Sequence, residues 1–141
     1  RRLQQALLRY MEEKQPYLNP DLQMADLAKA LGCSTHTLSQ LFSVQLHRNY
    51  YDFIAEYRIK AFQRLAQQPA NHNLTITALA EQCGFKSRNP FLVAFKKTTG
   101  MTPKDYMKRL RRGNDRNSWR FLSESSSSHH KRNQVPALKK W

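Results

Sequence analysis

Glycine, cysteine and acidic residues are all scarce in this chain of 141 residues. The four glycines are widely separated and form no glycine-rich loop of the kind that cradles phosphate in nucleotide-binding enzymes. No apolar run approaches the roughly 20 residues that a membrane-spanning helix needs, and no signal-peptide pattern is present. The few glycines and the many Leu, Ala, Gln, Arg and Lys residues favour helices over sheet.

The two cysteines, Cys33 and Cys83, follow and precede the two turn glycines at non-equivalent positions. This pattern predicts small apolar residues in a reducing compartment rather than a disulfide or a metal pair. No Cys/His set has zinc spacing, and His129 and His130 lie in a polar segment that predicts a solvated pair. No acidic residue accompanies a Ser/His or Cys/His arrangement that would activate a nucleophile. We therefore expect no enzyme activity, no cofactor and no metal site.

Positive charge dominates the chain, with 24 Lys and Arg residues against 10 Asp and Glu residues and a formal net charge of +14. A charge of this size implies a polyanionic partner, although RNA and anionic membranes attract cations as duplex DNA does. The charge is unevenly distributed, because residues 15–50 carry equal numbers of both signs while residues 86–112 hold nine basic residues against Asp105 alone. We expect phosphate contacts to concentrate on this second region.

A stretch of about forty residues occurs twice in the chain. The first five matched positions are 52 residues apart and the next five are 53 apart, because one residue is inserted after the glycine. Chance rarely produces such a register, so the chain contains an internal repeat. The matched pairs are Leu22 and Leu74, Met24 and Ile76, Leu27 and Leu79, Ala28 and Ala80, Gly32 and Gly84, Ser34 and Ser87, Leu38 and Phe91, Phe42 and Phe95, Asp52 and Asp105, and Phe53 and Tyr106.

Each copy has the pattern of a helix-turn-helix unit. In the first copy we expect helices over residues 2–14 and 24–31, with Gly32 in a left-handed turn and Ser34 capping the next helix. The first helix should bury one face, and the helix after Ser34 should expose a polar one. The expected buried residues are Leu3, Leu7, Leu8, Met11, Met24, Leu27, Ala28, Leu31, Leu38, Leu41 and Phe42, and the expected exposed ones are Thr35, His36, Thr37, Ser39 and Gln40.

A single long helix is predicted between the copies, over residues 52–67, because this segment lacks Gly and Pro and has apolar residues at helical spacing. Its length would be roughly 24 Å. The second copy should contain a hinge loop at 70–73, a helix over 76–83 capped by Thr75, and a helix over 88–98 capped by Ser87. Pro90 is tolerated because it lies in the first turn of this helix. A last helix is expected over 104–112.

The predicted fold is all-α and homeodomain-like, with two tri-helical helix-turn-helix subdomains joined by a long spacer helix. The expected organisation is an N-terminal helix with the first helix-turn-helix (1–51), the spacer helix (52–68), the second helix-turn-helix (69–112) and a flexible basic tail (113–141). The chain begins inside a helical pattern without an initiating methionine, and we expect it to be a fragment of a longer protein.

The polar faces of the two second helices are the candidate nucleic-acid contacts. Arg pairs bidentately with guanine and Asn with adenine, so Arg88 and Asn89 are candidates for base contacts, with an ordinary solvated face as the alternative. His36 and Gln40 occupy the same face in the first copy, and Lys96 and Lys97 suit phosphate contacts. The full candidate set is Ser34, Thr35, His36, Ser39, Gln40, Lys86, Ser87, Arg88, Asn89, Val93, Lys96 and Lys97.

The stretch from about Leu18 to Leu110 resembles the AraC/XylS-type transcription regulators, whose C-terminal DNA-binding domain has two helix-turn-helix units joined by a long helix. Residues 25–34 with Leu38, Leu41 and Phe42, and residues 58–61, carry part of this resemblance. Its most specific part is the series Gly84, Phe85, Phe95, Lys96, Lys97, Gly100, Thr102, Pro103 and Tyr106.

The resemblance implies a monomeric bacterial transcription regulator that contacts two adjacent major-groove segments of double-stranded DNA. It implies a cytoplasmic, nucleoid-associated protein with RNA polymerase as a further partner and an effector or sensor domain outside this segment, through which the parent protein could be membrane-tethered. Leu92 and Val93 stand where polar or basic residues are commoner, and Phe62 stands where a small residue is common. The family positions for base contacts fall on His36, Ser39, Gln40, Arg88, Asn89 and Val93.

Two other function classes fit the sequence less well. A non-specific nucleic-acid or RNA binder usually exposes a platform of stacking aromatic residues, whereas most aromatic residues here fall on predicted buried faces. A helical protein-interaction module would show no salt-sensitive affinity for DNA. Duplication, positive charge and polar helix faces coincide, and this favours a sequence-specific binder of duplex DNA.

Overall fold

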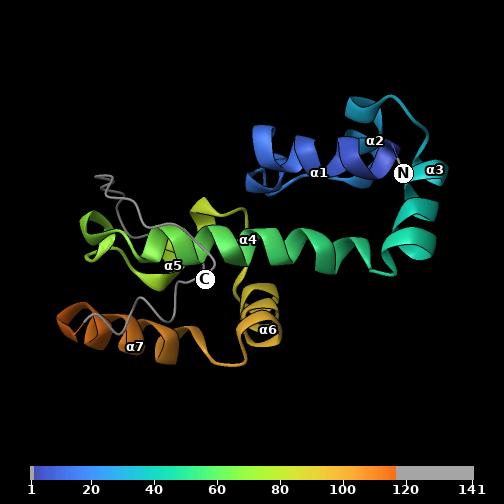
Figure 1. The fold of residues 1–141 in the computed structure, drawn as a ribbon. Helices are drawn as coiled ribbons and strands as arrows, with labels where there is room; N and C mark the ends of the chain where they lie inside the picture. Colours follow the sequence, from blue (N-terminus) through green and yellow to red (C-terminus); the bar gives the residue numbers. More distant parts are fainter. Residues whose placement is uncertain (1, 117–141) are drawn as a thin grey trace.

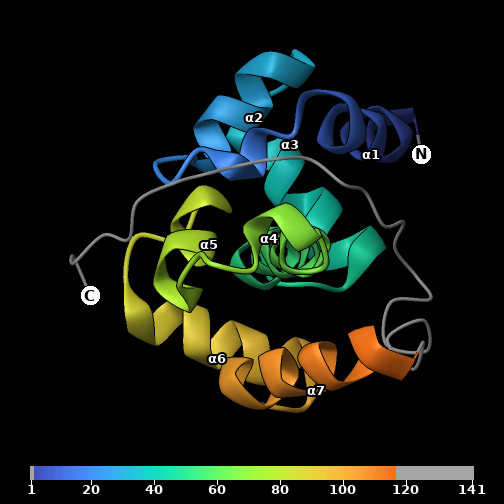
Figure 2. The same cartoon turned by 90° about the vertical axis from the view of Figure 1, so that its left-hand side faces the viewer.

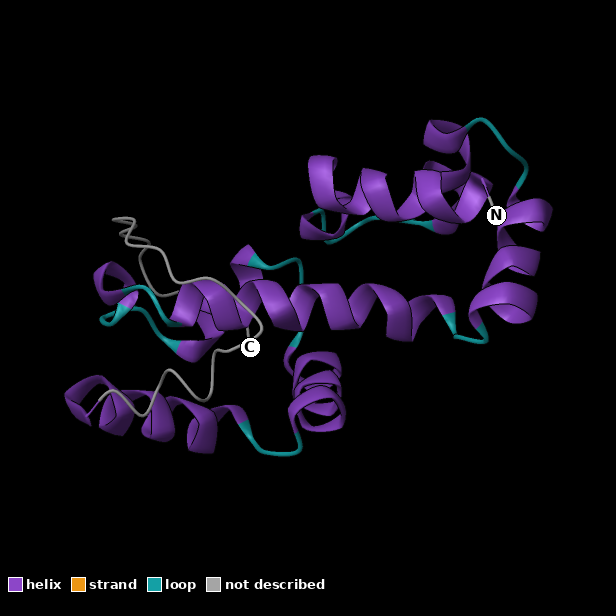
Figure 3. Cartoon of the chain, viewed as in Figure 1, coloured by secondary structure: helices purple, strands orange, loops and turns teal. Residues whose placement is uncertain are grey.

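The computed structural model describes the backbone of residues 2–116 and the side chains of residues 2–112 (Figures 1 and 3). Within this range the chain forms helices and turns and no strand, as the sequence predicts. The elements, in chain order, are α1 (Arg2–Lys14), η1 (Pro16–Leu18), α2 (Met24–Leu31), α3 (Thr35–Gln40), η2 (Leu41–Leu46), α4 (Tyr50–Ala66), η3 (Pro69–Asn71), α5 (Ile76–Gln82), α6 (Arg88–Thr99) and α7 (Pro103–Arg116).

The long helix α4 lies in the middle of the molecule. Figure 2, which looks down its axis, shows the first unit (α1 to α3) on one side of α4 and the helices α6 and α7 on the opposite side. Helix α5 lies beside the C-terminal half of α4 (Figure 1). The two halves of the repeat are therefore arranged around one shared helix.

The first unit forms as its local signals predict. Helix α1 has the expected bounds and buries Leu7 and Met11, whereas Leu8 is 37% exposed, so its predicted burial was wrong. Leu8 is adjacent to Leu7 in sequence and points about 100° away around the helix, toward an open pocket that it lines with Tyr17 and Leu46. Gly32 ends α2 in the left-handed region at a φ of 72°.

We call the second helix of each helix-turn-helix unit its recognition helix, which is α3 in the first unit and α6 in the second. The first recognition helix is longer than α3 alone, because α3 continues directly into the π-helical segment η2. Ser34 caps its start, since its hydroxyl accepts a hydrogen bond from the Thr37 amide at 3.1 Å. His47 closes its end with a φ of 52°, an uncommon value for a residue with a side chain. Short π-helical stretches occur frequently at functional sites.

Helix α4 is a core element of both units. Near its start Phe53 packs edge-on against Phe42 at a ring distance of 5.1 Å. Near its end the fully buried Phe62 lies 5.2 Å from Phe91 and 5.4 Å from Phe95. The helix begins at Tyr50, two residues before the predicted boundary, because Asn49 accepts a hydrogen bond from the Tyr51 amide at 2.7 Å and caps it.

The second unit departs from its prediction at the hinge loop and at the cap of α6. The expected hinge loop at 70–73 is partly the 3-10 turn η3, held by the buried Asn71, whose side-chain amide donates to the Leu65 carbonyl at 3.0 Å. Thr75 caps α5 as predicted by accepting from the Ala78 amide at 3.0 Å. Ser87 occupies the N-cap position of α6, but its side chain makes no capping hydrogen bond.

Helix α7 continues through Gly113 to Arg116, so helical structure extends past the predicted start of the basic tail. The remainder of that predicted tail, residues 117–141, lies outside the described residues. None of the helices in residues 2–116 combines the length and the apolar character that crossing a membrane requires.

Candidate nucleic-acid interface

The first recognition helix presents a polar exposed face. Thr35, His36, Ser39 and Gln40 are all exposed, while Leu38 between them is fully buried. Ser34 is also exposed, but its hydroxyl is engaged within the helix, contacting both the amide and the hydroxyl of Thr37. The face predicted from the sequence is therefore accessible, with Ser34 holding the helix start in place.

The second recognition helix presents Arg88, Asn89 and Val93 to solvent, and Val93 is 66% exposed. The side chains of Arg88 and Asn89 make no hydrogen bond or ion pair within the described part of the chain, so their donors are available to a ligand. Leu92 is half-buried against the core rather than presented on the outer face. Of the two apolar residues expected on this face, Leu92 and Val93, only Val93 is exposed to solvent.

Two of the predicted lysine contacts are engaged by carboxylates from other elements. Lys97 lies 2.9 Å from Asp52 at the start of α4, and Lys86 lies 2.7 Å from Asp21 before α2. The hydrogen bond and the positive charge of Lys86 lower the pKa of the Asp21 carboxyl. The exposed Lys96 makes no ion pair among the described residues. Sequence reasoning missed Asp21 and Asp52, because nothing local indicates that residues 45 or 65 positions apart meet.

A groove of about 930 Å³ lies between the N-terminal end of α4 and helix α6. One wall carries the base-contact candidates Asn89 and Val93, and the other carries residues that the sequence analysis did not single out. Among these, Tyr51 is 76% exposed, and Arg48 forms an ion pair with Glu56. The groove therefore connects the recognition surface of α6 to the end of the first recognition helix.

The spacing of the two recognition helices depends on α4, whose 17 residues span roughly 25 Å at 1.5 Å per residue. Successive major grooves on one face of B-DNA lie about 34 Å apart. Helix α6 packs across α4, with Lys97 beside Asp52 and Phe91 beside Phe62. This crossing sets the separation of the two recognition helices together with the length of α4. A polar face on each recognition helix and one stiff helix to which both units attach are features that a two-site duplex binder needs.

A family model described as "Helix-turn-helix domain" matches residues 27–109, which is more than half of the chain. The chain belongs to the AraC-type helix-turn-helix family. This AraC-type domain is 32% identical over 85 residues to an AraC-like protein of Streptomyces lividans, a match that covers 60% of the chain and 27% of the relative. It is also 33% identical over 94 residues to the HTH-type transcriptional activator RhaR of Salmonella arizonae, covering 67% of the chain and 28% of the relative.

Solved structures show the same fold. The C-terminal domain of AraT, a response regulator from Geobacillus stearothermophilus, aligns with a TM-score of 0.60 and 24% identity, covering 91% of this chain and 93% of that one. The AraC-type domain spans about a quarter of the length of the curated relatives that it matches. The family match therefore identifies a helix-turn-helix domain of the kind found in AraC-type transcription regulators.

Proposed function

We propose that this AraC-type domain binds duplex DNA sequence-specifically, with the recognition helices α3 and α6 in two adjacent major-groove segments. The observation that carries the proposal is the pair of exposed polar helix faces, one on α3 before α4 and one on α6, which packs across α4; the side chains of Arg88 and Asn89 are unengaged by other described residues. His36, Ser39 and Gln40 would contact one block of bases, and Arg88, Asn89 and Val93 the other. Because the two sets differ, the preferred site is asymmetric.

The remaining candidate residues would hold the DNA backbone. Thr35, Ser87 and Lys96 are exposed at or near the recognition faces, and Ser87 makes no capping hydrogen bond that would compete with a phosphate. Lys86 and Lys97 would exchange their carboxylate partners for phosphate oxygens, while Ser34 would hold the start of α3 in place. In the parent protein, an effector or sensor domain outside this segment and RNA polymerase would be the further partners.

Selection of bound sites from a random duplex library tests this proposal. We expect an enriched asymmetric site with two dissimilar blocks about 10 base pairs apart, because successive major grooves on one face of the duplex have that period. Equal binding of specific and scrambled duplexes at physiological salt would contradict it and favour the non-specific binder. Absence of any salt-sensitive DNA affinity would favour a protein-interaction module. A palindromic site bound only by a dimer would contradict the two-helix arrangement.

Arg88 and Lys97 are expected to contribute in different ways. Arg88→Ala should cost roughly 1–3 kcal/mol of binding free energy and relax base preference in one block, because a bidentate base contact is lost. Lys97→Ala should weaken all duplexes by similar factors and lower the salt slope by about one unit, because a phosphate contact is lost. Affinities on the selected site and its point variants, measured over a range of salt concentrations, separate the two. Unaltered base preference in Arg88→Ala would place that residue on an ordinary solvated face.

A further inference from the structure

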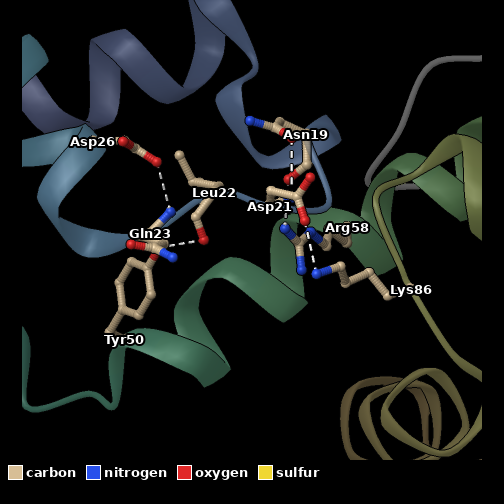
Figure 4. Close-up of polar contacts among 8 residues, drawn as sticks. All are labelled: Asn19, Asp21, Leu22, Gln23, Asp26, Tyr50, Arg58 and Lys86. Carbon is tan, nitrogen blue, oxygen red and sulfur yellow. Dashed lines mark hydrogen bonds and ion pairs between the residues drawn. The ribbon is translucent and has the colours of Figure 1, made fainter.

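The segment before α2 and the turn before α6 meet on one arginine of α4. Arg58 donates from Nε to the Tyr17 carbonyl at 2.7 Å. It also donates from a terminal guanidinium nitrogen to the Asn19 carbonyl at 2.9 Å (Figure 4). Burial lowers the pKa of Arg58, which stays charged because a guanidinium pKa is so high. A half-buried charge bonded to two backbone carbonyls holds the first unit's loop against α4 in one geometry.

The turn of the second unit lies directly on the same carbonyl. A Cβ atom added to Gly84 would stand 2.3 Å from the Tyr17 oxygen and 2.8 Å from the Arg58 Nε. The next residue, Phe85, places its ring 5.9 Å from the Arg58 guanidinium carbon. Backbone from the second unit therefore contacts backbone from the first unit at van der Waals distance, with Arg58 beside both.

An ion pair completes this contact at the outer edge. Lys86, which directly precedes the N-cap of α6, lies 2.7 Å from Asp21, which lies two residues before Gln23, the N-cap of α2 (Figure 4). We call the contact formed by Tyr17, Asn19, Arg58, Gly84 and the Asp21–Lys86 pair the inter-unit junction. It joins the loop that leads into α2 to the turn between α5 and α6.

We propose that the inter-unit junction fixes the separation and rotation of α6 relative to α3, and that it thereby determines which spacing between the two base blocks the protein accepts. This inference rests on the proposed function. One added base pair moves a block by about 3.4 Å along the duplex and by roughly 35° around it. The closely packed backbone of the junction has few alternative arrangements. It therefore cannot move one recognition helix to match a block that is displaced by one base pair. Arg58 is in this sense a positioning residue, because it acts through the loop before α2 and the turn before α6.

Spacing variants of the selected site test the inference. In these duplexes the gap between the two blocks selected by the native protein is shortened or lengthened by up to two base pairs. The affinity of the protein is then measured for each duplex. The native protein should favour one spacing by at least about tenfold over its neighbours, because a displaced block presents mismatched bases. Arg58→Ala should reduce this preference to about threefold or less while base preference within each block is unchanged, because the contacts to each block are retained when the connection loosens.

Two further variants of α4 serve as controls. Lys60→Ala removes an exposed cation of the same helix that lies 3.9 Å from Glu56 and makes no polar contact with a junction residue in the described part of the chain, so it should keep the native spacing preference. Arg58→Lys keeps the positive charge but places its donors on one nitrogen, which cannot reproduce the guanidinium geometry. It should lose spacing preference as Arg58→Ala does, which separates positioning from charge.

Thermal unfolding of each variant shows whether it is folded at the assay temperature. A folded Arg58→Ala variant that retains the native spacing preference would overturn the inference. If Arg58→Ala does not fold, Asp21→Asn tests the inference instead, because it removes only the exposed ion pair. It should weaken the spacing preference by a smaller factor. An unchanged spacing preference in that variant would overturn the inference. Failure of the native protein to select any pair of blocks would instead overturn the proposed function.

Discussion

Gly84→Ala is expected to lower the free energy of unfolding by about 2–5 kcal/mol. Two costs add: a residue with a Cβ in the left-handed region loses about 1–2 kcal/mol, and forcing an atom into a packed contact costs about 1–3 kcal/mol. Gly84 has a φ of 101°, and its new Cβ would lie 2.3 Å from the Tyr17 carbonyl oxygen. That oxygen belongs to the backbone of the other unit, so relief requires the units to separate. Urea unfolding monitored by helical circular dichroism measures the change.

Gly32→Ala is the matched control, because Gly32 stands at the equivalent turn of the first unit. It has a φ of 72°, but no atom outside its chain neighbours lies within 4 Å of the position of its Cβ. The substitution should cost only the conformational part, about 1–2 kcal/mol. The difference between the two variants is the contribution of packing at the inter-unit junction. Equal losses would show that the Gly84 contact relaxes freely and that the junction is not rigid.

DNA affinity is expected to fall roughly a thousandfold between 50 and 200 mM salt. If about six of the nine basic residues in 86–112 neutralise phosphates, the logarithm of the affinity changes with that of the salt concentration with a slope of about −5, because each contact releases counterions. Fluorescence anisotropy with a labelled duplex at several salt concentrations gives the slope directly. A slope between zero and −1 would show that the basic residues make no set of phosphate contacts.

Asp52→Asn refines this measurement. In the free protein Asp52 holds Lys97 at 2.9 Å, so a phosphate that binds Lys97 competes with this carboxylate. Removing the competition should raise affinity for every duplex and make the salt slope steeper. The same substitution in a Lys97→Ala background should have a smaller effect, and this difference isolates the pair from the general loss of a negative charge. Glu13→Gln, at an exposed position on α1, controls for total charge.

Most of the local structure follows from the sequence because its causes lie within a few residues. Ser34 and Thr75 cap helices as predicted, since each bonds to an amide three residues ahead. Gly32 ends α2 in the left-handed conformation that its position predicts. Burial of single residues was predicted less well: Leu8 and Leu92 depend on which neighbours cover each helix face. The predicted groups of DNA-contacting residues are accessible on α3 and α6, and their contacts to DNA remain predictions.

The sequence by itself determined the all-α fold, the repeat, most of the helix starts and the family, because these depend on short-range periodicity, capping and motif spacing. The tertiary structure decided which distant residues meet. Arg58 and the Tyr17 carbonyl are 41 positions apart, and Lys97 and Asp52 are 45 apart. Phe62 is an example of such a residue: it belongs to the core of the second unit because α4 packs against α6 and places its ring beside Phe91 and Phe95. Such contacts depend on the packing of whole helices, which no local sequence pattern encodes.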